Sequence, residues 1–128
     1  MQLETCFTDC VLRSFDFLTS EYGFQCVRVE KSRVRFESDK VFVEIGYDAF
    51  RSYELDCAVG LLSDKGQKRP MNLMEILRLA NTEKKEFYTI IQASTPERLE
   101  KYVPRLADLL ERYGREFLLG KHEIFDVD

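Results

Sequence analysis

The amino-acid sequence predicts an α+β fold: an N-terminal helix, a four-stranded antiparallel meander sheet, and then two to three helices that pack on one face of the sheet. Three observations lead to this class. Apolar residues recur at helical spacing before residue 23 and again after residue 94, and they alternate with polar residues between 24 and 62. The connections inside the alternating segment are too short for parallel crossovers. A length of 128 residues fits a single domain over 1–128.

The first predicted helix carries an apolar stripe at intervals of four, four, three and four residues, which is the spacing of one helix face. The stripe consists of Phe7, Val11, Phe15, Leu18 and Tyr22. Gly23 follows it as the left-handed residue that ends many helices.

Four strands are predicted next, because apolar residues occupy every second position. Their apolar residues are Val27 and Val29 in the first, Val34 and Phe36 in the second, Val41, Val43, Ile45 and Tyr47 in the third, and Tyr53, Leu55, Cys57 and Val59 in the fourth. Connections at 31–32, 38–39 and 48–52 are short, so neighbouring strands are expected to be antiparallel.

The middle hairpin allows a register prediction. If Ser38 and Asp39 form a two-residue loop, the residues opposite each other are fixed. The pairs are Val34 with Val43, Phe36 with Val41, Arg33 with Glu44, and Glu37 with Lys40. This register places the apolar pairs on one face and two opposite-charge pairs on the other.

The second half of the chain is predicted to be helical after a polar loop at 63–70. Asn72 is a candidate N-cap with Glu75 three residues later, opening a helix through about Ala80. A short helix is expected from 82 to about 92, with Phe87, Ile90 and Ile91 facing inward.

The last predicted helix begins at residues 94–97 (STPE), a cap residue followed by proline in the first turn. Its apolar stripe consists of Leu99, Val103, Leu106, Leu110, Tyr113 and Phe117. Pro104 lies inside this stripe and should bend the helix or split it.

The sheet face that the first and last helices leave uncovered is the candidate binding surface. Strand alternation assigns to it Arg33, Arg35, Glu37, Phe42, Glu44, Glu54 and Asp56. Aromatic residues surrounded by charge are typical of interface centres. The candidate partner-binding residues are therefore Phe42, Glu44, Phe50, Glu54 and Asp56. For Phe42, the alternative is local packing. For the acids, the alternatives are a solvated face that Arg33 and Arg35 balance, and a cation-binding or acid/base group.

Composition excludes several function classes. The net charge is −4, and residues 1–62 hold the whole acidic excess, with 7 Lys and Arg against 11 Asp and Glu. This balance argues against nucleic acid as a partner, and the basic group Lys65, Lys68 and Arg69 has no aromatic neighbour on which a base could stack. No apolar run approaches the roughly 18 residues that a membrane span needs. Without a secretory signal pattern, we expect a cytoplasmic protein.

Catalytic and metal-binding patterns are also missing from the sequence. The single histidine, His122, stands in a charged tail, and no nucleophile elbow, phosphate-binding loop or zinc-protease motif occurs. Cys6 and Cys10 have helical spacing, but two thiols need further ligands to hold zinc. We therefore predict no catalytic residues, no metal and no cofactor, and four reduced, mostly buried cysteines.

Four segments carry a resemblance to a known kind of protein. They are 34–44 (VRFESDKVFVE), 51–55 (RSYEL), 60–62 (GLL) and 94–97 (STPE). Over about residues 10 to 119, the chain resembles small bacterial single-domain proteins similar in size and layout to toxin-immunity proteins. Pro104 and the cysteine-rich start depart from that pattern. The resemblance implies an immunity role and, lacking a catalytic motif, transfers no functional residues.

The sequence thus favours a cytoplasmic protein-interaction module rather than an enzyme. In this hypothesis an acidic, aromatic-bearing sheet face occludes a basic site on another protein, and charge speeds the encounter. Two alternatives remain: a small-ligand-binding or enzymatic domain that uses the acidic residues of the sheet, and a homodimeric structural module that pairs through a sheet edge.

Overall fold

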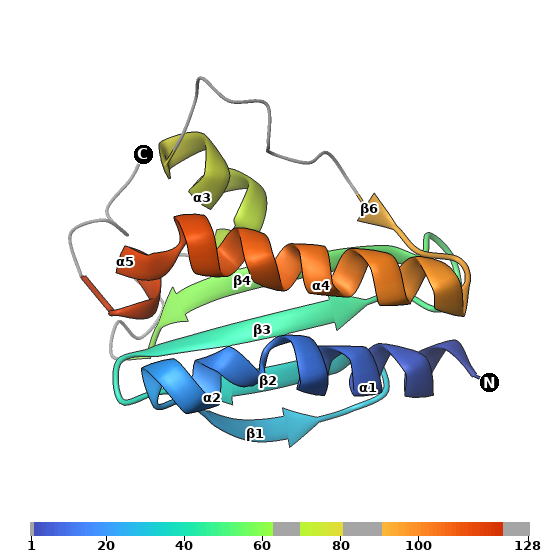
Figure 1. The fold of residues 1–128 in the computed structure, drawn as a ribbon, viewed down its shortest axis with the longest axis horizontal. Helices are drawn as coiled ribbons and strands as arrows, with labels where there is room; N and C mark the ends of the chain where they lie inside the picture. The colour runs from blue at the N-terminus through green and yellow to red at the C-terminus, as the bar shows by residue number, and fades with distance from the viewer. Residues whose placement is uncertain (1, 63–69, 81–90, 122–128) are drawn as a thin grey trace.

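The structure, a computed structural model, describes residues 2–62, 70–80 and 91–121. Its helices are α1 (Leu3–Ser14), α2 (Asp16–Tyr22), α3 (Leu73–Ala80), α4 (Pro96–Tyr113) and α5 (Arg115–Leu118), and its strands are β1 (Gln25–Val29), β2 (Arg33–Glu37), β3 (Val41–Tyr47), β4 (Glu54–Leu61), β5 (Met71–Asn72) and β6 (Ile91–Gln92) (Figure 1). The predicted α+β class, with an N-terminal helix before an antiparallel sheet, is confirmed.

The sheet has the order β1-β2-β3-β4-β5, and β6 also pairs with β4. The four predicted meander strands are therefore present, but the two short strands were not predicted. Ile91 and Gln92 were expected to end a helix and instead pair with Leu55 and Glu54. A two-residue strand is too short to show an alternating pattern. The rest of that expected helix, including Phe87 and Ile90, lies outside the described residues, as does most of the expected loop at 63–70.

The predicted register of the β2–β3 hairpin is wrong by two residues. The observed pairs are Val34 with Ile45, Arg35 with Glu44, Phe36 with Val43, and Glu37 with Phe42. The turn lies at Asp39 and Lys40 because Ser38 bonds to Val41: the Ser38 N–H donates to the Val41 carbonyl at 2.9 Å, and the Ser38 Oγ accepts from the Val41 N–H at 3.1 Å. A shift of two residues keeps every side chain on its predicted face.

The predicted first helix is two helices that share one buried stripe. Phe15 interrupts the helix with φ −99° and ψ 14°, yet its side chain is fully buried together with those of Phe7, Val11 and Leu18. Gly23 ends α2 with φ 75°, as predicted.

The helix starts in the second half follow the predicted caps. Asn72 and Glu75 form a reciprocal capping box, with the Glu75 N–H donating to Asn72 Oδ1 at 2.9 Å and the Asn72 N–H donating to Glu75 Oε1 at 3.1 Å. Thr95 Oγ1 accepts from the Arg98 N–H at 3.2 Å and caps α4. Pro104 does not split α4, which runs for 18 residues. Pro104 lies on the exposed side, where water can satisfy the carbonyl that loses its helical donor.

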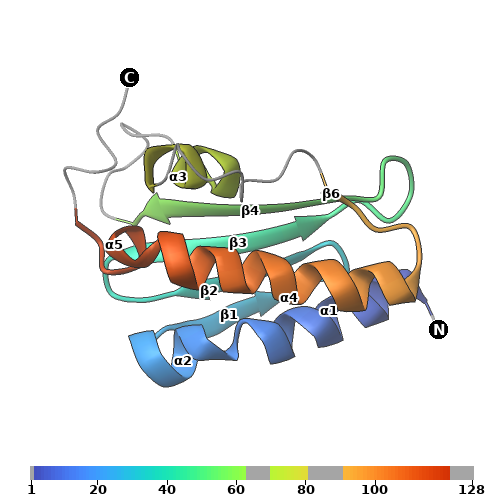
Figure 2. The ribbon, with the colours of Figure 1, turned by 45° about the horizontal axis from the view of Figure 1, so that its top comes forward.

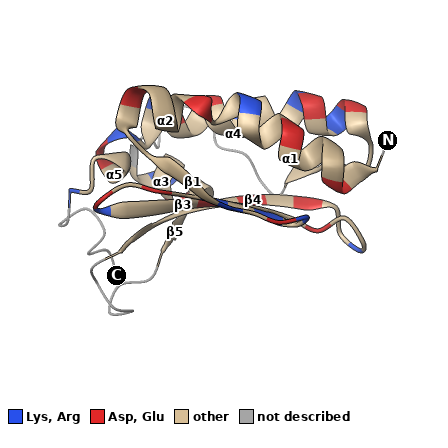
Figure 3. Cartoon of the chain, turned by 90° about the horizontal axis from the view of Figure 1, so that it is seen from below, with Lys and Arg blue, Asp and Glu red and all other residues tan. Residues whose placement is uncertain are grey.

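The helices and the sheet form two layers. α1 and α4 lie side by side on one face of the sheet (Figure 1 and Figure 2), and the view in Figure 3 places α1, α2 and α4 together on one side. The core between the layers includes all the predicted inward residues of β2 and β3. No described helix is long and apolar enough to cross a membrane.

Candidate functional site

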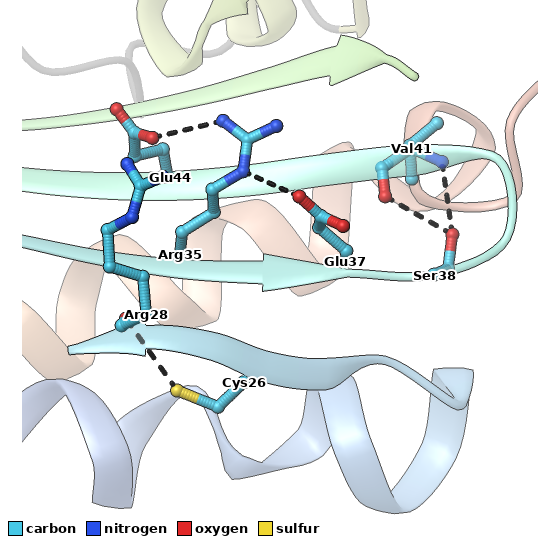
Figure 4. A network of polar contacts seen from close by, with 7 residues as sticks. All are labelled: Cys26, Arg28, Arg35, Glu37, Ser38, Val41 and Glu44. Atoms are coloured by element: carbon cyan, nitrogen blue, oxygen red, sulfur yellow. Dashed lines mark hydrogen bonds and ion pairs between the residues drawn. The ribbon is translucent and has the colours of Figure 1, made fainter. Parts of the chain in front are cut away.

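The centre of the uncovered sheet face is a network of acids and arginines (Figure 4). Glu44 of β3 accepts from Arg33 at 2.9 Å and from Arg35 at 3.1 Å, and Arg35 also donates to Glu37 at 2.8 Å. The Arg35 and Glu44 side chains are only about one-fifth exposed. Two guanidinium groups therefore balance the charge of Glu44, so Glu44 contributes little free negative charge to this face.

Phe42, the second predicted contact residue on β3, is half-buried. Its ring lies across Gly60 of β4, where an added Cβ would collide with it. The Arg35 guanidinium carbon lies 4.0 Å from the ring centroid. The ring fills the space that a glycine leaves in a strand and is covered by a cation, an arrangement that stabilises a sheet.

The other three predicted contact residues lie together at one end of the sheet. Phe50, Glu54 and Asp56 line a pocket of about 480 Å³. The remaining lining residues are Ser32, Arg33, Tyr47, Asp48, Ala49 and Ser52. Asp48, Glu54 and Asp56 contribute three carboxylates to the pocket and Arg33 contributes one guanidinium, so the pocket lining is acidic.

Asp48 organises the loop that carries Phe50. Its Oδ1 accepts from the backbone N–H groups of Phe50 at 3.0 Å and of Arg51 at 3.1 Å, and its Oδ2 accepts from the Ser52 hydroxyl at 3.2 Å. These hydrogen bonds lower the pKa of Asp48, and the one from the Phe50 N–H has the largest effect. Tyr53 ends the loop with φ 58°, a left-handed conformation uncommon for an aromatic residue. Phe50, at the tip of this loop, is 79% exposed.

β6 and Ala93, the residue that follows it, hold the base of the same loop. The Tyr47 hydroxyl donates to the Ala93 carbonyl at 2.6 Å, the Ala93 N–H donates to the Tyr53 carbonyl at 2.8 Å, and Gln92 Nε2 donates to the Ser52 carbonyl at 2.9 Å. Burial raises the pKa of Tyr47 to about 12, so its hydroxyl remains a donor at neutral pH. The pocket is therefore supported by two segments that are about forty residues apart in the chain.

The Asp56 carboxylate is held in the pocket with its pKa raised above the ordinary aspartate value. Partial desolvation raises its pKa, the Arg33 guanidinium opposes that rise, and the carboxylates of Glu44 and Glu54 add to it. The net direction is upward even though the Gly46 N–H and Arg33 stabilise the charged form. A cation entering the pocket would relieve this repulsion.

Replacing Asp56 by asparagine is expected to stabilise the protein at neutral pH. A raised folded-state pKa means that the folded state binds the proton more tightly than the unfolded chain, so ionisation of Asp56 costs stability as the pH rises above about 3.9. The gain should stay below about 1 kcal/mol, because the residue is only partly desolvated and the remaining solvent contact screens its charge. Denaturant unfolding of both proteins across pH measures it.

The matched control for this prediction is Asp9→Asn, at an exposed position on α1. It should leave the free energy of unfolding nearly unchanged. The gain from Asp56→Asn should also vanish below the ordinary aspartate pKa, where the wild-type side chain is neutral. A loss of stability at neutral pH would mean that the interactions with Arg33 and the Gly46 N–H outweigh desolvation and the acidic neighbours together.

The cysteines offer little chemistry in the described residues. Cys6, Cys10 and Cys57 are buried and Cys26 is exposed, in agreement with the prediction of mostly buried cysteines. β1 is an edge strand with every residue exposed, so strand alternation does not bury Cys26. Burial raises the pKa of Cys6 to about 11, which keeps it a thiol.

Within the described residues, no three His, Cys, Asp or Glu side chains group to hold a metal. His122 and the basic group at Lys65, Lys68 and Arg69 lie outside them.

Sequence reasoning missed the residues that build the pocket around Phe50. Asp48 followed by Ser52 in DAFRS is a signal for a side-chain-capped turn and could have been recognised. The contributions of Tyr47, Gln92 and Ala93 depend on the β4–β6 pairing and have no local signal.

Compared with protein-family models, curated proteins and solved structures, the chain matches none.

Proposed function

We propose that this protein is a cytoplasmic protein-interaction module that binds a basic surface of another protein through the pocket and the Phe50 loop. The observation that carries the proposal is the position of Phe50: 79% exposed, on a loop held by Asp48, beside a pocket lined by three carboxylates and one arginine. An apolar side chain held in water by local hydrogen bonds suits a contact with a partner.

The chemistry of the pocket favours a lysine or arginine side chain as its occupant. Such a group would interact with Glu54 and Asp56 and stabilise the charged form of Asp56, whose pKa is raised by desolvation first and by the neighbouring carboxylates second. The Phe50 ring would pack beside it, against apolar surface of the partner. The carboxylates would also speed the encounter with a basic protein.

Inhibition by occlusion is the form of this function that we favour. The resemblance to toxin-immunity proteins implies it, and the acidic pocket is compatible with a basic catalytic or substrate-binding site on the partner. The central network of Arg33, Arg35, Glu37 and Glu44 would then form the flat surface around the contact.

A small cationic ligand is the second candidate. The pocket volume of about 480 Å³ lies within the range of small-molecule sites. This function would use Glu54 and Asp56 without requiring an exposed Phe50.

Photo-crosslinking separates these two functions. A photoreactive phenylalanine analogue placed at position 50 in cells that make the protein should capture one defined protein with a basic surface. The same analogue at Leu79, an apolar residue of α3 that is 51% exposed, is the matched control and should not capture that protein. Equal capture at both positions, or none at position 50, would contradict the proposed interface.

A further inference from the structure

β1 presents an open edge of the sheet. Among the described strands it pairs with β2 alone, and all five of its residues are exposed. Two of them are apolar: Val27 is 49% exposed and Val29 is 52% exposed. Unpaired backbone groups beside apolar side chains form a template for another strand.

The backbone hydrogen bonds between β1 and β2 identify Val29 as the residue whose N–H and C=O are open at this edge. The Glu30 N–H donates to the Arg33 carbonyl at 2.8 Å, so Glu30 bonds toward β2. In an antiparallel ladder alternate residues bond to opposite sides, and Val29 therefore directs its N–H and C=O away from β2. Before Val29, a bulge between Cys26 and Arg28 interrupts the regular edge.

The charges that flank Val29 are self-complementary. When two copies of the edge pair antiparallel with Val29 on the two-fold axis, Arg28 of each copy lies opposite Glu30 of the other. Val29 then exchanges both backbone hydrogen bonds with its equivalent, and the Arg28–Glu30 positions form the closer, non-hydrogen-bonded pairs. Centring the pairing on Arg28 or on Glu30 would instead place like charges opposite each other.

Both charges are available for such a contact. In the part of the chain that the structure describes, neither Arg28 nor Glu30 forms an ion pair. Figure 4 shows the Arg28 side chain extending from β1 over β2 toward Glu44, so a rotation about its own side-chain bonds would bring its guanidinium to the open edge. Arg28 lies opposite Arg35 across the β1–β2 ladder, and Glu37 and Glu44 already pair with Arg35, so neither carboxylate depends on Arg28 for its charge balance.

We propose that two copies of this chain associate through their β1 edges, with Val29 on the two-fold axis and two reciprocal Arg28–Glu30 ion pairs. The two sheets become one continuous sheet, and the isologous geometry closes the assembly at two copies. This interface uses none of the residues that line the Phe50 pocket, so its outcome is independent of the proposed function.

Charge reversal tests the register directly. Sedimentation equilibrium with reductant present should show a dimer for the wild-type protein. Arg28→Glu and Glu30→Arg should each weaken it at least about tenfold, because both ion pairs become repulsive. The double variant should restore the homodimer, and a one-to-one mixture of the two single variants should form a heterodimer with both ion pairs restored.

The control variant is Glu100→Arg, which changes the net charge as Glu30→Arg does, at an exposed position on α4. It should dimerise as the wild-type protein does, and thermal melts should show every variant folded. A wild-type protein that stays monomeric at about 1 mM, the weak end of specific association, would overturn the proposal. A dimer that is insensitive to both single reversals would overturn it as well, because its interface would lie elsewhere.

Discussion

Replacing Phe7 by alanine is expected to lower the free energy of unfolding by about 3–5 kcal/mol, the cost of removing a large buried ring. Phe7 lies in α1, is fully buried, and stacks on the Tyr47 ring of β3 with centroids 5.2 Å apart. It therefore joins the helix layer to β3 at Tyr47, a residue that also lines the pocket. A domain of this size has about 5–15 kcal/mol of stability in total, so this substitution removes a large part of it. Denaturant unfolding followed by circular dichroism measures the change.

Phe17→Ala provides the matched comparison for Phe7→Ala. Phe17 lies on α2 and is only partly buried, with ring contacts to Phe15 and Tyr22. Its loss should be clearly smaller, because less surface returns to water and less of a cavity remains. Equal losses at the two positions would contradict the placement of Phe7 at the centre of the core.

The side-chain faces of the sheet could be predicted from the sequence because they depend only on parity. Val34, Phe36, Val41 and Val43 are all buried, as expected, although the register is two residues away from the predicted one. A shift of two residues changes the partners and preserves the faces. The pairing that decides the register is made by Ser38, whose hydrogen bonds to Val41 move the turn to Asp39 and Lys40. Apolar patterning alone carries no such information.

The candidate site was only partly predictable for a similar reason. Phe42, Glu44, Glu54 and Asp56 share the expected face because alternation assigns them there. The division of that face into a balanced network around Glu44 and an acidic pocket beside Phe50 arises from contacts between strands. The pocket also depends on β6, two residues that pair with β4 across a long stretch of chain. Contacts of this kind depend on tertiary packing and leave no periodic signal.

Phe42 and Phe50 should behave differently when each is replaced by alanine. Phe42→Ala removes a half-buried ring that covers Gly60 and contacts Arg35, so it should lower the free energy of unfolding by about 2 kcal/mol. Phe50→Ala removes a side chain that is 79% exposed and should change stability by no more than about 0.5 kcal/mol.

Binding kinetics should show the reverse order. With the partner captured at position 50, Phe50→Ala should raise the dissociation rate constant about 30-fold, which corresponds to the roughly 2 kcal/mol of an interface hot spot. Phe42→Ala should leave that rate constant nearly unchanged when it is measured on the folded fraction of the variant. The Phe42 ring packs against Gly60 and Arg35 within the protein and is therefore not the partner contact. Surface plasmon resonance gives both rate constants. Faster dissociation from Phe42→Ala together with an unchanged rate from Phe50→Ala would move the contact to the centre of the sheet and contradict the pocket as the binding site.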